Sequence, residues 1–421
     1  MRRSMSLPVA RKLRRTLLFG LSLQALLGSA ALAEPAPPFK ELLRQAQATA
    51  PRLAEARAEI ARAEGLARQA GAFPNPTVGV QVENFAASNG LHMAETTASI
   101  EQTIELGGKR PARIAAGRAD VEAARRRVAR VQSEYAFDLA AAYAEAEGSD
   151  RRLQLAADGL ELAQEDARIA GVLVEAGREA DLRRVQAQAA VQAARAAVDQ
   201  AKAARATAFA NLTAMVGAPA PITSIPVSLL DEAAKAVRTP DPNPLASPSY
   251  LAAEAEREAA ARRVRVERTQ ATPDVTVSFG VRKTQENNAT AMLAGVAMPF
   301  PIFNRNGGNI SAARAELSAA EARLHAARLD AEAAARSGIA RVSAAETRLV
   351  AARGGEQTAE EAYRLTRIGY EGGKLALVEL LSARRALTEA RTQTIEAATE
   401  RLSAQAALAR LAGVTPFGDQ P

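Results

Sequence analysis

The sequence of 421 residues contains no cysteine and no tryptophan, and aromatic residues make up only 4% of it. Without cysteine the chain forms neither disulfides nor thiolate sites, and with so few aromatic side chains it cannot easily build a thick globular core. After residue 33 no apolar run reaches the roughly 18 residues of a membrane-spanning helix. The abundant residues, alanine, arginine, glutamate and leucine, are typical of long helices and coiled coils.

The first 33 residues have the pattern of a secretory signal peptide. A basic segment that ends at Arg15 precedes a short apolar core, and Ala31-Leu32-Ala33 matches an A-x-A cleavage site before Glu34. The full chain has a net charge of +7, and removing the six basic residues of this segment leaves about +1. Such a small charge gives no support to nucleic-acid binding.

A strand runs into a long helix within residues 295–323, and the rest of the chain is organised around this joint. Apolar residues alternate with small residues or proline, which predicts a strand with one apolar face. Pro299 and Pro301 weaken ladder pairing, so the strand is expected to end or bend there. A corner at 304–308 follows, and from Ile310 onward apolar residues recur at helical spacing. The alternating apolar positions are Val296, Met298, Phe300 and Ile302.

The same joint occurs once more, 196 residues earlier. An offset of 196 relates Ile114 to Ile310 and continues without a gap through the helical hairpins, whereas before the strand hairpin the offset is 197, as between Pro51 and Pro248. The chain is therefore predicted to be a tandem duplication of a strand, strand, long helix, return helix unit. The joint residues are Gly107, Gly108 and Pro111 in the first copy and Pro301, Gly307 and Gly308 in the second.

These patterns predict the organisation of the whole chain. The expected segments are a signal peptide at 1–33, a first repeat at 34–217, a proline-rich linker at 218–248, a second repeat at 249–413 and a C-terminal tail at 414–421. In the first repeat the expected elements are a helix at 39–72, strands at 77–83 and 96–106, a long helix at 111–176 and a return helix at 179–216.

Two separated strand hairpins leave unpaired edges. Each strand is about 9–12 residues, which is long enough to cross a bilayer when tilted. In an exported chain this pattern favours a transmembrane β-barrel that other protomers complete. The alternative is a small soluble sheet that caps a helical bundle, and the shortage of aromatic residues for an interfacial girdle supports it.

Over essentially the whole mature chain, this arrangement resembles the TolC-like outer-membrane factors. The segments IELGGKR at 104–110, PIFNRNGGNI at 301–310 and YEGGKLALVELLSARRAL at 370–387 are most similar to CzcC-type members, the outer-membrane components of cation efflux systems. The resemblance implies a mixed fold: a homotrimer in which four strands per chain form one transmembrane β-barrel, continuous with a long α-helical barrel.

The resemblance also implies a function. It indicates an exit duct in the outer membrane, with its helical part in the periplasm, for a tripartite efflux system of the resistance-nodulation-division class. The exported substrates would be divalent heavy-metal cations such as cobalt, zinc or cadmium, and the partners a periplasmic adaptor protein and an inner-membrane pump. The alternatives are a periplasmic coiled-coil adaptor, which would have one hairpin and not two in tandem, or a periplasmic scaffold.

Enzyme chemistry finds no support in the sequence. The two histidines, His92 and His325, are far apart in the repeat plan, so no metal site is expected. The glycine-lysine turns at 107–109 and 372–374 lack the remaining residues of a phosphate-binding loop. No catalytic residue, no cofactor and no nucleic-acid partner is expected.

The resemblance places a candidate periplasmic gate near the helical turns. Tyr370 matches the family's gate tyrosine, and Glu379 matches one position of an acidic ring in the lumen. Lys374 stands beside Leu375, which occupies the family's basic gate position, and Arg183 stands where the family has an acidic partner. For Lys374 and Arg183 the alternative is an ordinary solvated residue at a helix end.

Both ends of the helical hairpins carry further candidates. Gly177 and the pair Gly372-Gly373 are the candidate adaptor-docking turns. At the strand ends, Lys109, Arg110 and Arg305 either pair with anionic groups at the membrane interface or are solvated helix-end residues.

Overall fold

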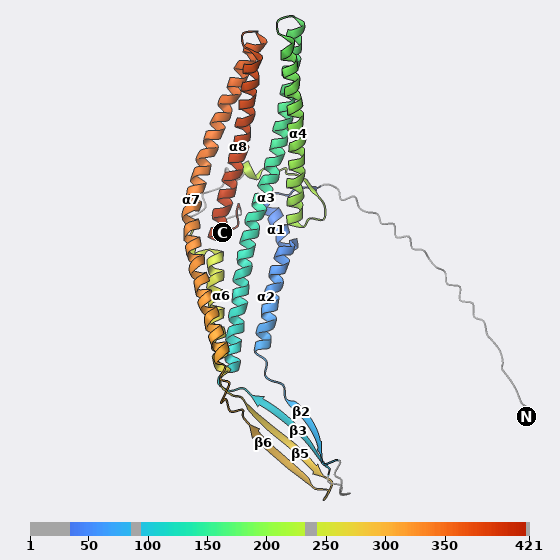
Figure 1. Ribbon diagram of the computed structural model, residues 1–421, viewed down its shortest axis with the longest axis vertical. Coiled ribbons are helices and arrows are strands. Elements are labelled where there is room, and N and C mark those ends of the chain that lie inside the picture. The colour runs from blue at the N-terminus through green and yellow to red at the C-terminus, as the bar shows by residue number, and fades with distance from the viewer. Residues whose placement is uncertain (1–33, 86–93, 232–241, 418–421) are drawn as a thin grey trace, which may run out of the picture.

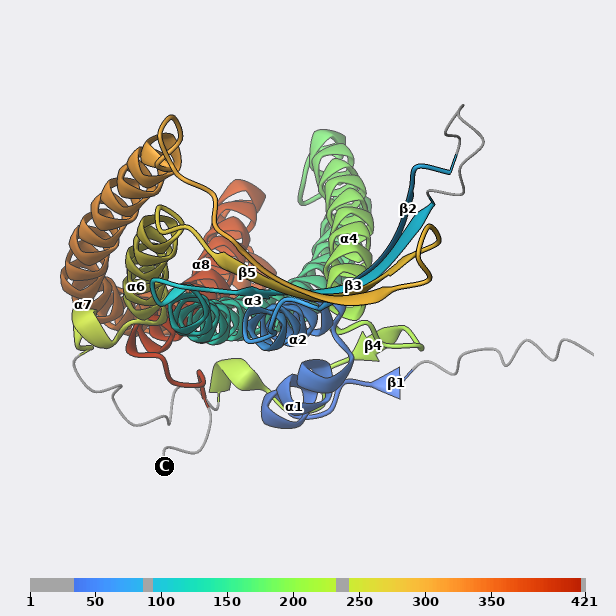
Figure 2. The same cartoon turned by 90° about the horizontal axis from the view of Figure 1, so that it is seen from below.

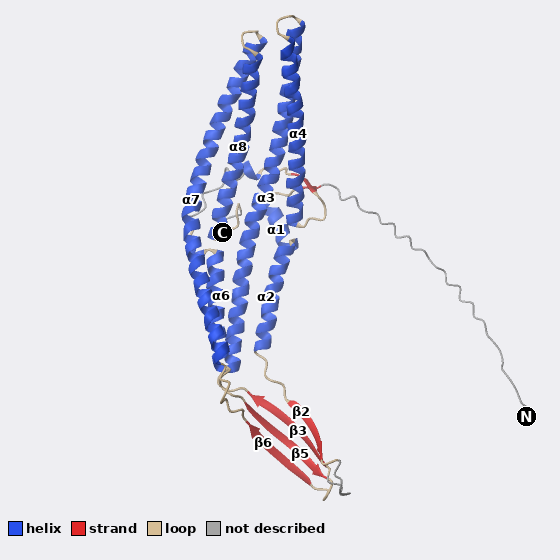
Figure 3. Ribbon diagram, viewed as in Figure 1, coloured by secondary structure: helices blue, strands red, loops and turns tan. Residues whose placement is uncertain are grey.

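The computed structural model describes residues 34–85, 94–231 and 242–417, which form one elongated molecule (Figure 1). Helices make up most of its length, and one four-stranded sheet lies at the end opposite the helical turns (Figure 3). The predicted signal peptide, most of the turn between the first two strands, part of the linker and the last four residues lie outside the described residues.

Two antiparallel helical hairpins run the length of the helical part. The first pairs α3 (Lys109–Glu175) with α4 (Asp181–Val216), and the second pairs α7 (Gly307–Glu371) with α8 (Leu377–Ala412). The long helices α3 and α7 have no proline beyond their first turn, so the hydrogen-bond ladder continues without a break. Near the turns α3 packs against both α4 and α8, which joins the two hairpins.

Two shorter helices widen the half of the molecule nearer the sheet. Helix α2 (Pro51–Ala70) packs against α3, and α6 (Pro248–Thr269) packs between α3 and α7. The four helices therefore form one curved layer in the order α2-α3-α6-α7, which is visible end-on in Figure 2. Helices α2 and α7 are its two flanks.

The sheet has the strand order β2-β3-β5-β6 and is antiparallel throughout. The strands are β2 (Thr77–Glu83), β3 (Glu95–Ile104), β5 (Val275–Thr284) and β6 (Thr290–Ala297). The central pair joins the two halves of the chain, with Ile100 opposite Phe279. Among the described residues, β2 and β6 have no strand on their outer edges.

The register gives the sheet one apolar and one polar face. On the apolar face one row across the four strands consists of Val80, Ala98, Val281 and Met292. The next row along belongs to the other face and consists of Gln81, Thr97, Arg282 and Ala291. On the polar face Arg282 forms ion pairs with Glu83 and Glu95. The apolar face is open: Val80 is 71% exposed and Met292 is 90% exposed.

The main core lies at mid-height, on one side of α3. Helix α1 (Phe39–Thr49) packs there, and β1 (Glu34–Pro35) pairs with β4 (Ile222–Ser224) of the linker. The Phe39 ring contacts the Tyr143 ring edge-on at 5.8 Å. The Glu147 carboxylate accepts hydrogen bonds from the backbone N–H groups of Leu229 and Leu230 at 2.9 and 3.1 Å. The proline-rich linker, which also contains η1 (Pro244–Ala246), is thus packed onto α3 and is not a free connection.

Two local expectations were wrong. The predicted helix at 39–72 is broken at Ala50, because a residue that precedes proline avoids the helical conformation. The strand in the second joint ends at Ala297, so Met298, Phe300 and Ile302 follow it as exposed residues without ladder pairing. The two prolines there explain the early end.

Candidate functional site

The two helical turns have the same backbone hydrogen bonds. In the first, the N–H groups of Arg178 and Glu179 both donate to the Leu173 carbonyl, and in the second Lys374 and Leu375 donate to the Gly369 carbonyl. Each turn has a glycine in the left-handed conformation. The φ angle is 69° at Gly177 and 71° at Gly373, where a Cβ atom would be strained. Gly372 caps α7 with an ordinary helical φ of −75°.

The two turns approach each other through one side chain. A Cβ atom at Gly373 would lie 2.6 Å from a guanidinium nitrogen of Arg178, whereas a Cβ atom at Gly177 would meet nothing within 4 Å. The Arg178 side chain therefore reaches from the first turn onto the second. A Cβ atom at Gly373 would push this flexible guanidinium aside.

Tyr370 lies in a small apolar cluster between the two hairpins. Its side chain is 1% exposed, and the cluster draws residues from all four helices. Its members are Ala170 on α3, Ala187 on α4, Tyr363 and Tyr370 on α7, and Leu377, Leu380 and Leu387 on α8. The hairpins are thus held by a buried cluster, which is firmer than the few weak contacts expected of a reversible gate.

The Tyr370 hydroxyl is buried and has no hydrogen-bond partner. Burial raises its pKa, the charges of Glu179 and Asp166 raise it further, and the charge of Arg183 lowers it. The hydroxyl is therefore a neutral polar group that the fold buries without compensation.

The other three candidate gate residues make local contacts. Arg183 donates to the Gln186 side chain at 3.0 Å and lies 3.7 Å from the Glu179 carboxylate. Glu379 accepts a hydrogen bond of 3.3 Å from the Ala376 N–H and so caps the start of α8. Lys374 is exposed in the turn. The charge of Arg183 acts on the Tyr370 hydroxyl, whereas Lys374 and Glu379 are exposed to solvent.

Sequence reasoning missed a buried ion pair near the turns. Arg384 of α8 donates to the Asp166 carboxylate of α3 at 2.8 Å, and the two side chains are only 11% and 2% exposed. Burial raises the pKa of Asp166, and the positive charge of Arg384 offsets only part of this effect. The pair joins the first hairpin to the second through the protein interior.

A sequence signal for this pair existed. Asp166 lies between the buried Ala163 and Ala170, at the spacings of three and four that mark the apolar seam of α3. Arg384 interrupts the buried series of α8 in the same way. A charged residue at a seam position needs a buried partner, so two such residues of opposite charge predict each other.

The joints at the sheet end are built differently in the two halves. In the first, Gly107 and Gly108 have φ angles of 67° and 73°, and α3 begins at Lys109. Pro111 is therefore the third helical residue and not the first. In the second, Asn306 has the left-handed conformation with φ 58°.

The glycines of the second joint do not form the expected corner. Gly307 and Gly308 are the first two residues of α7 and border open space. Pro301 lies in the irregular segment between β6 and α7. Asn306 can replace glycine because its short polar side chain tolerates the left-handed conformation, and here it donates to the Glu267 carbonyl at 2.8 Å.

Two basic residues of the first joint are structural. The Lys109 ammonium pairs with Asp274 at 2.7 Å and is 6% exposed. The Arg110 guanidinium donates to the Gly71 carbonyl at 2.7 Å and stacks 4.0 Å from the centre of the Phe73 ring. Neither expectation for these residues, membrane-surface pairing or simple solvation, was right. Lys109 instead ties the first half to the second.

Metal ligands and spanning helices were also sought among the described residues. Within residues 34–85, 94–231 and 242–417, no three His, Asp or Glu side chains gather in a way that could hold a metal ion. None of the described helices combines the length and apolar character of a membrane-spanning helix.

Comparison with known proteins identifies close relatives. NccC of Alcaligenes xylosoxydans xylosoxydans, a nickel-cobalt-cadmium resistance protein, is 41% identical over 418 residues, which cover 99% of this chain and 95% of NccC. CnrC of Cupriavidus metallidurans, a nickel and cobalt resistance protein, is 43% identical over 314 residues, 74% of this chain and 75% of CnrC. CzcC of the same organism, a cobalt-zinc-cadmium resistance protein, is 30% identical and covers 82% of this chain and 84% of CzcC.

Solved structures share the fold. The outer membrane protein VceC of Vibrio cholerae superimposes with a TM-score of 0.72 at 20% identity, covering 90% of this chain and 97% of VceC. CusC superimposes with a TM-score of 0.76 at 16% identity, covering 89% and 92%.

The family model described as "Outer membrane efflux protein" matches two segments, residues 42–218 and 245–414. Both contain a complete strand-strand-helix-helix series. This match removes the adaptor and scaffold alternatives. The chain therefore belongs to the outer membrane efflux protein family, whose members are transport ducts and not enzymes.

Proposed function

We propose that three copies of this chain form the exit duct of a tripartite efflux system of the resistance-nodulation-division class. The observation that carries the proposal is the four-stranded sheet, which has one open apolar face, one polar face and two edges that pair with no other strand of the described residues. An exposed edge of this kind is a template for pairing with a strand of another chain. In a membrane, closure into a barrel is the arrangement that satisfies every backbone group.

The two faces of the sheet fit this closure. A barrel in the outer membrane presents apolar side chains to lipid and polar side chains to its water-filled interior. The valine-rich face would then meet lipid, and the face with Arg282, Glu83 and Glu95 would line the duct. The helices continue from the strands as a tube in the periplasm, toward an adaptor protein and an inner-membrane pump.

The exported substrates are proposed to be divalent heavy-metal cations. Support comes from NccC, CnrC and CzcC, whose names record resistance to nickel, cobalt, cadmium or zinc. A passive duct needs no bound cofactor and no catalytic residue, because the pump supplies energy and selection.

Two matched variants test the lipid-facing assignment. Val80 and Gln81 are neighbours on β2 that belong to opposite faces. Val80→Arg would place a charge in the lipid and cost about 2–4 kcal/mol near the bilayer midplane, whereas Gln81→Arg would face water. We expect Val80→Arg to reduce the amount of protein in purified outer membranes and Gln81→Arg to leave it unchanged. Equal amounts would contradict the barrel.

A deletion strain tests the substrate. Loss of this chain should lower the tolerated concentration of nickel, cobalt, cadmium or zinc, and the plasmid-borne gene should restore it. Unchanged tolerance to all four ions, with an intact pump and adaptor, would overturn the metal assignment and leave the duct in place.

The helical turns are proposed as the gate and the adaptor-docking end. Tyr370, with Arg183 nearby, lies between the hairpins, and Lys374, Glu379 and the turn glycines lie at their ends. We expect Tyr370→Ala combined with Arg183→Ser to increase single-channel conductance in planar bilayers without loss of the trimer. Unchanged conductance would show that these residues do not hold the gate.

A further inference from the structure

The two flanks of the curved helical layer are copies of the two helices at its centre. An offset of 196 carries α3 onto α7, and an offset of 197 carries α6 back onto α2. Burial supports both equivalences, because Ala124 and its counterpart Ala320 are buried, as are Ala260 and its counterpart Ala63. The prolines that open α2 and α6, Pro51 and Pro248, also correspond.

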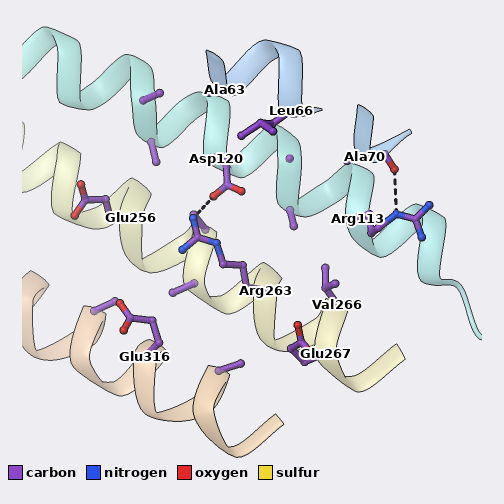
Figure 4. A pocket seen from close by; sticks show the side chains of 18 of the residues that line it. Ala63, Leu66, Ala70, Arg113, Asp120, Glu256, Arg263, Val266, Glu267 and Glu316 are labelled. Carbon is purple, nitrogen blue, oxygen red and sulfur yellow. Dashed lines mark hydrogen bonds and ion pairs between the residues drawn. The ribbon is translucent and has the colours of Figure 1, made fainter. Parts of the chain in front are cut away.

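The central pair of helices is joined by two ion pairs. The Arg127 guanidinium of α3 contacts the Glu256 carboxylate of α6 at 2.8 Å, and Arg263 of α6 contacts Asp120 of α3 at 2.6 Å. Both pairs border a groove of about 790 Å³ that runs across the inner sides of α2, α3, α6 and α7. Figure 4 shows the Asp120–Arg263 pair, with Glu256 and Glu316 beside it.

The offsets carry the first of these ion pairs onto the flanks. Arg127 becomes Arg323 on α7, and Glu256 becomes Glu59 on α2, so both the residue types and their charges are kept. These two residues lie on opposite flanks of the same chain and cannot meet within it, because α3 and α6 lie between α2 and α7. They can meet only between two chains.

The flanks keep the first ion pair of the centre but not the second. In the single chain Arg323 pairs with Glu316, and Glu59 pairs with Arg62, each within its own exposed helix surface. With the antiparallel alignment of α3 and α6 applied to the flanks, Glu59 falls beside Arg323. The second ion pair is not repeated, because Arg263 corresponds to Leu66 and Asp120 to Glu316. The register therefore aligns one opposite-charge pair between the flanks, Glu59 with Arg323.

We infer that a second copy of this chain docks its α2 flank on the α7 flank by repeating the α3–α6 interface, with Glu59 of one chain paired to Arg323 of the next. The inference rests on the proposed trimer and adds how the α2 flank of one chain is aligned along the α7 flank of the next. It gives one register to the whole ring: every boundary between neighbouring repeats, within a chain or between chains, has an arginine-glutamate pair at the same height above the sheet.

Cross-linking tests the register, because the chain has no cysteine of its own. In membranes, the variant Glu59→Cys/Arg323→Cys is treated with a short bismaleimide and run on a denaturing gel. We expect covalent dimers and trimers. The matched intrachain variant, Arg127→Cys/Glu256→Cys, should cross-link with a mobility change but no ladder.

A mismatched variant controls for chance encounters. In Glu59→Cys/Arg314→Cys the second thiol lies nine residues from Arg323, about 13 Å along the helix, so no ladder is expected. An equally strong ladder in this variant would overturn the inference.

Mass measurement in detergent separates the possible failures. A trimer without a ladder in Glu59→Cys/Arg323→Cys, while the intrachain control reacts, would overturn the register and leave the proposed duct intact. A monomer would overturn both. Charge exchange gives an independent readout: Glu59→Arg should lower the dissociation temperature of the trimer, and Glu59→Arg/Arg323→Glu should recover most of the loss. No recovery would count against the pair.

Discussion

The two helical turns have the same backbone and different surroundings. Their hydrogen bonds correspond one for one, and each has a glycine with φ near 70°. The side chains around them differ: Tyr370 in the second hairpin corresponds to Val174 in the first. Backbone geometry was repeated by duplication, whereas the buried contacts developed in one copy.

A similar contrast exists between two helix contacts near the turns: the contact of α3 with α8 inside the chain, and its counterpart between α7 and α4 on the outer flanks. Asp166 and Arg384 join α3 to α8 within the chain. The offset of 196 turns them into Ala362 on α7 and Gln188 on α4, which have no charge. Near the turns a buried ion pair therefore joins α3 to α8 within the chain, and the corresponding positions on α7 and α4 have no such pair. In a ring of three chains, we expect the helical ends to part more easily between chains than within one.

The largest effect is expected from breaking the buried pair. Asp166→Ala leaves the Arg384 charge buried without its partner, which costs about 3–5 kcal/mol. The measurement is hydrogen exchange of the helical ends near residues 160–190 and 365–390, which should become much faster. Gln188→Ala, at the uncharged counterpart position, should change exchange little.

A double variant distinguishes the charge from the packing. Replacing Asp166 and Arg384 together by leucine removes both charges and keeps an apolar contact, which is often neutral or stabilising. Exchange should then return toward that of the parent protein. If the single and double variants were equally labile, the ion pair would not be the source of the stability.

A smaller effect is expected at the turn glycines. Alanine at Gly373 or Gly177 must adopt a left-handed backbone, at a cost of about 1–2 kcal/mol. Only Gly373→Ala also displaces Arg178, because only there does the new Cβ meet the guanidinium. Spin labels at Glu179→Cys and Lys374→Cys should therefore move apart in Gly373→Ala and stay at the parent distance in Gly177→Ala. A similar change in both would show that Arg178 does not link the turns.

The smallest effect is expected from one hydroxyl group, and it should be stabilising. The Tyr370 hydroxyl is buried without a partner, so Tyr370→Phe relieves an uncompensated polar group and should raise stability by up to about 1 kcal/mol. Tyr135→Phe is the matched control with the opposite sign. Its hydroxyl donates to the Met215 carbonyl at 3.0 Å, and losing that bond costs about 1 kcal/mol. Thermal unfolding in detergent measures both, and a destabilised Tyr370→Phe would reveal a partner for the hydroxyl in the assembled duct.

The sequence alone determined the elements and their repetition. Alternating apolar residues predicted β6, helical spacing from Ile310 onward predicted α7 and, through the offset of 196, α3, and Gly177 and Gly373 predicted the turns. These features depend on neighbouring residues, so local patterns record them. Element boundaries were less secure. The break at Ala50 follows from Pro51, whose effect on the helix was overlooked, and β6 ends at Ala297, two residues before Pro299.

Only the tertiary structure decided which distant groups meet. The Asp166–Arg384 pair is separated by 218 residues and the Glu147 contact with Leu229 by 82. Lys109 gave no local sign that it would be buried against Asp274. Periodicity places a side chain on a face of its own helix or strand, but the partner of a buried charge depends on which faces the fold brings together. The sequence could therefore predict the duct, whereas the contacts that hold its hairpins required the structure.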